Sequence, residues 1–154
     1  MRPAAAGDER FLRDLYATTR RDEFAPFGWS PATLESFLDS QFGAQRFHYA
    51  AHYPHATQSV IQVEAIPVGQ LTLERAAESI HIIDLSVLPG HRGQGLGTAV
   101  LKMLQAAAAG VPIRLSVWHD NPAGRLYARL GFAERSADAV YRHLEWPAPL
   151  PATD

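Results

Sequence analysis

The sequence predicts an α/β (α+β) fold, in which one domain holds a mixed central β-sheet flanked by helices on both faces. Two helical stretches come first, and strands and helices then alternate. Residues 80–87 are almost continuously apolar, as expected for a strand buried on both faces. The 154 residues suit a single domain. We expect this domain to cover residues 1–146 and the proline-rich residues 147–154 to form a disordered tail.

The first half of the chain begins with two predicted helices. Residues 8–21 carry apolar side chains at helical spacing. An aromatic segment at 24–29 ends this helix. Ser30 is then a predicted N-cap, with Pro31 in the first helical position. The second helix ends near 53–54, and its apolar face consists of Leu34, Phe37, Leu38 and Phe42.

The period of the apolar residues then changes to that of strands. Residues 59–64 and 68–74 are predicted to form a hairpin around a tight turn at Ile66-Pro67. The buried strand at 80–87 follows. The remaining predicted elements are a helix from Leu96 to Gly110, a strand at 113–117, a short helix from Asn121-Pro122 to Gly131, and a last strand at 140–146.

Composition excludes several classes of function. The chain has no cysteine, which rules out disulfides, thiolate metal sites and a cysteine nucleophile. No apolar run reaches the roughly 20 residues that cross a bilayer, so no membrane partner is expected. The net charge of -2, with acids and bases interspersed, predicts no nucleic-acid partner. We interpret His48, His52 and His55 as a polar helix face and loop, and expect no metal site.

The segment Arg92-Gly93-Gln94-Gly95-Leu96-Gly97-Thr98 carries the main functional signal. It lies between a buried strand and a helix. Glycines let the backbone approach a ligand, and the first amides of the helix point to the same place, so the turn is a predicted anion site. A nucleoside triphosphate loop would need a lysine, which the segment lacks. A dinucleotide-binding fingerprint would need its last glycine at Thr98.

The segment from Leu85 to Gly97 resembles the signature of the GNAT N-acetyltransferase superfamily, Arg-x-x-Gly-x-Gly after a strand ending in Val-x-Pro. The segment from Leu115 to Phe132 resembles the second conserved block of that family. The two matches occur in the expected order and separation. One departure lies at the start, because the family opens with a strand and only Met1-Arg2 is left to form it.

The resemblance implies that the chain binds acetyl-CoA as a co-substrate. The pyrophosphate would contact the segment from Arg92 to Gly97, with Thr98 at its edge. Pantetheine would bond to the backbone of Leu85 and Val87 and contact Asn121, which is also a candidate helix cap. The implied residue that protonates the departing thiolate is Tyr127, for which a core role is the alternative.

A base is also needed for the incoming amine. Our first candidate is Asp84, which interrupts the apolar run at 80–83; a structural carboxylate is the equally weighted alternative. His91 and His119 are weaker candidates, and Ser116 stands where some relatives carry a glutamate. Aromatic side chains are expected to line the acceptor pocket, namely Phe24, Phe27, Trp29 and Tyr49, with Tyr141 opposite.

These interpretations predict an N-acetyltransferase. It would act on a primary amine of a small molecule or peptide, by direct attack in a ternary complex. A non-catalytic acyl-CoA sensor is the alternative, and a dinucleotide-binding module ranks below both. Because acetyl-CoA is an intracellular metabolite, a cytoplasmic location is expected. The acceptor and the oligomeric state, a homodimer included, stay open.

Overall fold

The computed structural model describes residues 1–147, so most of the predicted tail lies outside the described residues. The chain forms two compact units. Unit 1 consists of residues 1–72 and 84–94, and unit 2 of residues 73–83 and those from 95 onward. Hydrogen bonding joins the strands in the order β1 (Arg2–Pro3), β2 (Thr57–Val63), β3 (Ile66–Arg75), β4 (Ile80–Val87), β5 (Ile113–Trp118), β7 (Tyr141–Trp146) and β6 (Ala133–Ala137). Strands β3 (Ile66–Arg75) and β4 (Ile80–Val87) each contribute residues to both units.

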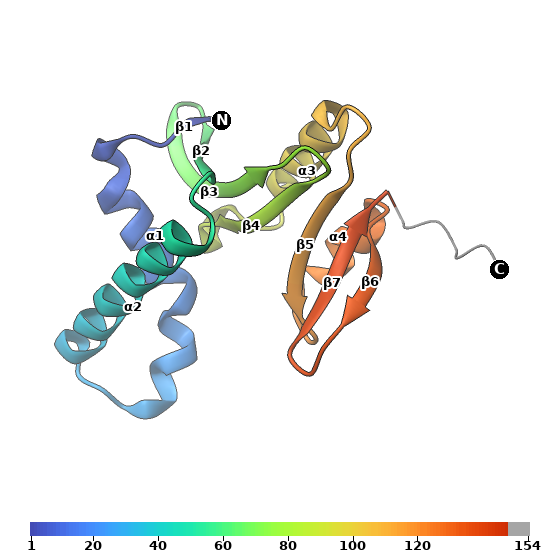
Figure 1. Cartoon of the computed structure of the whole chain (residues 1–154). Helices are drawn as coiled ribbons and strands as arrows, with labels where there is room; N and C mark the ends of the chain where they lie inside the picture. The colour runs from blue at the N-terminus through green and yellow to red at the C-terminus, as the bar shows by residue number, and fades with distance from the viewer. Residues whose placement is uncertain (148–154) are drawn as a thin grey trace. The chain divides into compact units, whose positions relative to one another are not determined.

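Unit 1 contains the first two helices and the first strands. Helix α1 (Glu9–Phe24) follows a short 3-10 turn, and α2 (Pro31–His52) begins where predicted. The Ser30 side chain caps α2 by accepting a 3.2 Å hydrogen bond from the Thr33 N–H. The two helices lie side by side (Figure 1). The buried core of this unit comprises Leu12, Leu15, Ala17, Leu38, Phe42, Val60, Ile61, Val68 and Leu71.

The opening strand of unit 1 is present but very short. Strand β1 (Arg2–Pro3) pairs antiparallel with β2 (Thr57–Val63), with Arg2 opposite Val60. Arg2 also forms a bidentate ion pair with Asp8, both N–O distances being 2.7 Å. Hydrogen bonds from Arg2 and from the Ala5 N–H lower the pKa of Asp8 to about 2. The ion pair therefore fastens the start of the chain next to α1.

The predicted turn of the β2–β3 hairpin is wrong. The turn is at Glu64 (φ 51°) and Ala65 (φ 66°), and Ile66-Pro67 already belongs to β3. Positive φ at both positions is that of a type I′ two-residue loop, whose backbone twist matches that of the strands. Proline cannot adopt positive φ, so the loop precedes Pro67.

Unit 2 contains the later elements. These are α3 (Leu96–Ala107), β5 (Ile113–Trp118), α4 (Gly124–Arg129), β6 (Ala133–Ala137) and β7 (Tyr141–Trp146). Strand β5 pairs parallel with the start of β4 and antiparallel with β7, so the sheet is mixed as predicted. The buried core comprises Leu73, Ile80, Ile82, Val100, Leu101, Leu104, Ala108, Ile113, Leu115, Val117, Tyr127, Phe132 and Leu144. Strand β6, which pairs antiparallel with β7 (Figure 1), was not predicted.

Candidate active site

A carboxyl group in unit 1 is held by a network of side chains. Asp84 on β4 accepts a 2.7 Å hydrogen bond from Gln70 Nε2 on β3. The same amide nitrogen donates to Ser86 Oγ at 3.0 Å. Gln70 is almost fully buried, with 4% of its surface exposed. A buried amide in such a position fixes the direction of the groups around it.

The orientation of the Gln70 amide follows from its other partners. Its Oε1 accepts hydrogen bonds from Thr72 Oγ1 at 2.7 Å and from Gln58 Nε2 at 3.3 Å. Two donors therefore face the oxygen, and two acceptors, Asp84 and Ser86, face the nitrogen. This arrangement presents N–H groups to the carboxylate and holds it in place.

The pKa of Asp84 is raised by burial, which disfavours the charged form. The positive charge of Arg20 and hydrogen bonds from Gln70 and the Leu85 backbone act in the opposite direction. Burial is the larger effect. A carboxylate with a raised pKa binds a proton more readily than an exposed aspartate does, which suits a general base.

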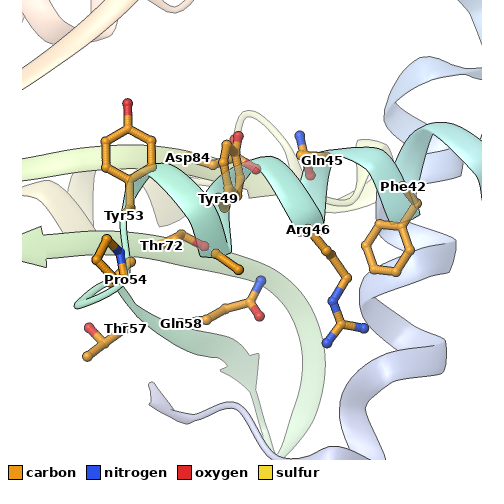
Figure 2. A pocket seen from close by; sticks show the side chains of 12 residues that line it. Phe42, Gln45, Arg46, Tyr49, Tyr53, Pro54, Thr57, Gln58, Thr72 and Asp84 are labelled. Atoms are coloured by element: carbon orange, nitrogen blue, oxygen red, sulfur yellow. The ribbon is translucent and has the colours of Figure 1, made fainter.

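The Asp84 carboxyl borders a cavity of about 430 Å³ in unit 1. Figure 2 shows Tyr49 from α2 close to Asp84, with Thr72 and Gln58 below them. Burial, and next the charge of Asp84, raise the pKa of Tyr49, so its hydroxyl stays protonated. The cavity is lined by Phe42, Gln45, Arg46, Tyr49, Ala50, Tyr53, Pro54, Ala56, Thr57, Gln58, Thr72 and Asp84. The lining combines tyrosine rings with amide, hydroxyl and carboxylate groups.

Three other aromatic residues predicted for this pocket, Phe24, Phe27 and Trp29, lie elsewhere in unit 1. Phe27 and Trp29 stack 5.3 Å apart between α1 and α2 and also contact Phe24. Phe27 is 62% exposed. The rings of Phe24 and Trp29 pack against Phe37 of α2, 4.9 and 5.0 Å away. Along the helix, the distance from Phe37 to Tyr49 is about 18 Å, so these rings lie away from Tyr49 and Asp84. Tyr141, the remaining predicted pocket residue, lies on β7 in unit 2, opposite Trp118.

The glycine turn has the backbone conformation that its sequence predicts. Gly93 (φ 73°) and Gly95 (φ 80°) both occupy the left-handed region, which other residues avoid. Gly95 is the N-cap of α3, so the first amides of this helix follow it directly. Gly97 has a different role, since a Cβ there would lie 3.1 Å from Leu126 Cδ2 on α4. The turn can therefore present backbone N–H groups to an anion.

The end of β4 directs peptide groups away from β3. The Leu88 N–H donates to the Val68 carbonyl at 2.8 Å. Since peptide groups alternate in direction along a strand, those of Leu85 and Val87 face the other side. The Val87 carbonyl accepts a 3.0 Å hydrogen bond from Arg92 Nε, which places the arginine on that side as well. This edge has the direction that strand addition by an extended ligand requires.

The two predicted site residues of the second block lie in unit 2. Asn121 Oδ1 accepts a 2.9 Å hydrogen bond from the Ala123 N–H, so it supports the turn that leads into α4. Tyr127 on α4 is buried, and its ring meets Phe132 edge-on at 5.6 Å. Asn121 therefore stabilises this turn and Tyr127 contributes to the core, in addition to any role in the chemistry.

Several residues of the unit 1 site were not found from the sequence. Gln70 and Thr72 are polar residues that alternate with the apolar Leu71 and Leu73, and this alternation marks one face of β3. This alternation could have identified Gln70 and Thr72 from the sequence. Arg20, Gln58 and Tyr53 carry no such signal, because only the packing of α1, α2 and β2 brings them near Asp84.

Comparisons with known proteins agree with these features. A sequence model of the acetyltransferase (GNAT) domain matches residues 54–134. The chain is 46% identical over 72 residues to a mycothiol acetyltransferase from Frankia alni. The match covers 44% of this chain and 22% of that protein, so the chain spans only part of the relative's length.

Solved structures share the fold at low identity. The PaiA N-acetyltransferase from Thermoplasma acidophilum, in complex with coenzyme A, superposes with a TM-score of 0.71 and 16% identity, over 94% of this chain and 95% of that one. An acetyltransferase from Thermus thermophilus gives a TM-score of 0.67 and 21% identity, over 94% of this chain and 93% of that one. These matches confirm the predicted fold class.

Among residues 1–147, none of the helices combines the length and the apolar character that a membrane span requires. The family match covers both the glycine turn and the whole second block, the two segments that carry the resemblance. It confirms the predicted family. The chain belongs to the GNAT acetyltransferase family.

Proposed function

We propose that this protein transfers an acetyl group from acetyl-CoA to a primary amine of a small molecule or peptide, by direct attack in a ternary complex. The observation that carries the proposal is the Asp84 carboxyl group, which borders a cavity and has a raised pKa. A lysine-type amine has a pKa of about 10.4 and must lose a proton before it can attack. Asp84 accepts that proton.

The donor is held by the edge of β4 and by the turn that follows it. The amides of Gly93 to Gly97 bind the pyrophosphate, Arg92 adds charge, and Thr98 lies at the margin. The positive φ of Gly93 and Gly95 supports this assignment. Pantetheine bonds to the peptide groups of Leu85 and Val87, which face away from β3, and contacts Asn121.

The thioester supplies the electrophilic acyl carbon, and the protein supplies proton transfer and alignment. The Val87 N–H polarises the thioester carbonyl. After the amine attacks, the Tyr127 hydroxyl protonates the departing thiolate, since a phenol with a pKa of about 10 is protonated at neutral pH. The tyrosine-lined cavity next to Asp84 receives the amine, because aromatic rings attract cations.

The Asp84→Asn variant tests this proposal directly. We expect kcat/KM to fall by about 100-fold or more, the scale of a lost general base, because asparagine cannot accept the proton. The assay follows released coenzyme A thiol across a panel of primary amines that includes polyamines, amino sugars and peptides. The panel also identifies the acceptor class.

The matched control is Asp39→Asn, which removes an exposed carboxylate of α2 in the same unit. Its turnover should equal that of the unchanged protein. Full turnover in Asp84→Asn would remove Asp84 as the base. Binding of acetyl-CoA without turnover of any amine in the panel would instead support an acyl-CoA sensor.

A further inference from the structure

Three side chains of unit 2 form a continuous hydrogen-bonded chain that the proposed function does not use. Ser116 Oγ on β5 lies 2.7 Å from His143 Nδ1 on β7. His143 Nε2 lies 3.1 Å from Asp138 Oδ2. Ser116 and His143 face each other directly in the β5–β7 ladder, so the sheet register brings them together. The order serine, histidine, aspartate is that of a nucleophile, its base and the group that orients the base.

Asp138 is fixed by the turn between β6 and β7. Its Oδ1 accepts hydrogen bonds from the N–H groups of Val140 at 2.8 Å and Tyr141 at 2.7 Å. Its backbone carbonyl lies 2.7 Å from His119 Nε2. The backbone hydrogen bonds, with a smaller contribution from His143, lower the pKa of Asp138 to about 2. The carboxylate is therefore ionised at neutral pH, and its Oδ2 is directed at His143.

The ionised carboxylate determines how protons are arranged along the chain. Since Asp138 Oδ2 can only accept, His143 Nε2 must carry the hydrogen. Nδ1 of the neutral imidazole is then an acceptor, and the Ser116 hydroxyl donates to it. Each hydrogen bond thus points from serine towards aspartate, which is the polarity that a serine nucleophile requires.

The surroundings indicate which compounds can reach Ser116. The residue is exposed, so its hydroxyl is accessible from solvent. Trp118 lies two residues from Ser116 on β5, and Tyr141 lies two residues from His143 on β7, both on the same face of the sheet. They form a cross-strand pair, and their side chains are 52% and 45% exposed. Exposed aromatic rings beside a nucleophile offer a stacking surface for an aromatic leaving group.

We propose that Ser116 is a nucleophilic serine that accepts small acyl groups from aryl esters, with His143 as its base and Asp138 as the residue that positions His143. This reaction does not need coenzyme A and stands apart from the proposed acetyl transfer.

The reaction needs no reactant besides the aryl ester and water. Ser116 Oγ attacks the acyl carbon while its proton passes to His143 Nδ1, and the imidazolium is stabilised by the Asp138 carboxylate. The bond between the acyl carbon and the aryl oxygen breaks, and the proton from His143 passes to the departing phenolate. The product is an acyl ester on Ser116. Attack by water, with His143 again taking the proton, releases the carboxylic acid and restores the serine.

The test uses the full chain with p-nitrophenyl acetate and an alkyl fluorophosphonate, whose adduct does not hydrolyse. We expect a burst of one equivalent of p-nitrophenolate and a stable phosphonyl adduct on the Ser116 peptide by mass spectrometry. Ser116→Ala should abolish both. His143→Ala should slow labelling by about 100-fold, the scale of a lost base.

The matched control is Ser136→Ala, because Ser136 on β6 borders the same histidine from its other side. Labelling of this variant should be unchanged. An adduct on Ser136, no adduct on Ser116, or an unchanged rate in His143→Ala would overturn the proposal.

Asp138→Asn tests the positioning role. Asparagine keeps an acceptor for the two backbone N–H groups, but its amide can donate to Nε2 and favour the other tautomer. We expect labelling at least about 10-fold slower, with the imidazole nitrogen chemical shifts of His143 showing the tautomer change. Unchanged shifts and an unchanged rate would exclude the role. Since no reagent here contains coenzyme A, these results are independent of whether acetyl transfer occurs.

Discussion

At the scale of single residues, the chemistry of Asp84 is set by what surrounds its carboxyl group. Burial raises its pKa, and the hydrogen bond from Gln70 opposes that shift. The Asp84 carboxyl group therefore loses its proton at a higher pH in the folded protein than in the unfolded chain. A base works only when deprotonated, so activity should rise as the pH increases through this raised pKa.

Gln70→Met isolates the contribution of the amide. The substitution keeps the length of the side chain but removes the N–H that favours the charged carboxylate. We therefore expect the pKa of Asp84 to rise further and the acid limb of the kcat/KM profile to move to higher pH. The plateau at high pH should change by only about twofold, because the base itself remains. The measurement is a pH–rate profile from released coenzyme A thiol.

The control for this profile is Gln62→Met on β2, where the glutamine amide donates a 3.3 Å hydrogen bond to the carbonyl of the turn residue Ala65. Its profile should match that of the unchanged protein. An unmoved acid limb in Gln70→Met would mean that Gln70 does not act through Asp84.

The residues of the site differ in how far the sequence could predict them. Asp84 is a candidate from the sequence because it interrupts an apolar run, and Tyr49 because aromatic side chains suit an amine pocket. Phe27 and Trp29 were proposed for the same reason, yet they precede α2 and stack on each other. Aromatic composition alone does not distinguish residues that line a pocket from residues that stack on one another. The position of each residue relative to a long helix decides between the two.

At the scale of elements, β3 and β4 approach each other unusually closely beside the Asp84 network. A Cβ at Gly69 would lie 2.5 Å from the Ser86 carbonyl oxygen and 3.3 Å from Val87 Cα. Backbone atoms cannot yield as a flexible side chain can. Gly69 therefore lets β4 hold Asp84 and Ser86 within reach of Gln70.

Gly69→Ala should lower the free energy of unfolding by about 1–3 kcal/mol, because the strands must separate to admit the methyl group. The matched control is Gly43→Ala in α2, where a Cβ would meet nothing within 4 Å. Alanine in a helix should raise stability there by about 0.5–1 kcal/mol. Urea unfolding curves measure both. Equal stabilities of the two variants would show that the close approach has no cost.

The sequence predicted most elements but missed one strand and one turn. Helix α1 has clear apolar periodicity, α2 has the start signal Ser30-Pro31, and β4 has an apolar run. By contrast, β6 (Ala-Glu-Arg-Ser-Ala) is mostly exposed and has no apolar alternation, so nothing in its pattern separates it from a loop. Its pairing with β7 is what makes it a strand. The Glu64-Ala65 turn lacks the usual glycine or asparagine signal.

At the scale of the whole molecule, family membership was predictable because it depends on two short segments with strict spacing. The glycine turn and the second block could each be recognised without knowledge of the packing between elements. The acceptor could not be predicted in this way, because the cavity at Asp84 is built from α2, β2, β3 and β4 together. The proposed donor site is therefore local in the sequence, whereas the proposed acceptor cavity depends on tertiary structure.

Acetyl-CoA should therefore stabilise the whole protein, and NAD should not. A ligand at about 100 times its Kd that binds only the folded state adds about 2.7 kcal/mol, or roughly 5–10 °C in Tm for a chain of this length. Thermal unfolding with each ligand measures the shift. Arg92→Ala should reduce it, because the guanidinium contributes to pyrophosphate binding, whereas Arg125→Ala, on the exposed side of α4, should not. Stabilisation by NAD alone would overturn the assignment of the glycine turn to coenzyme A, since a dinucleotide needs the same anion site but a different set of later strands.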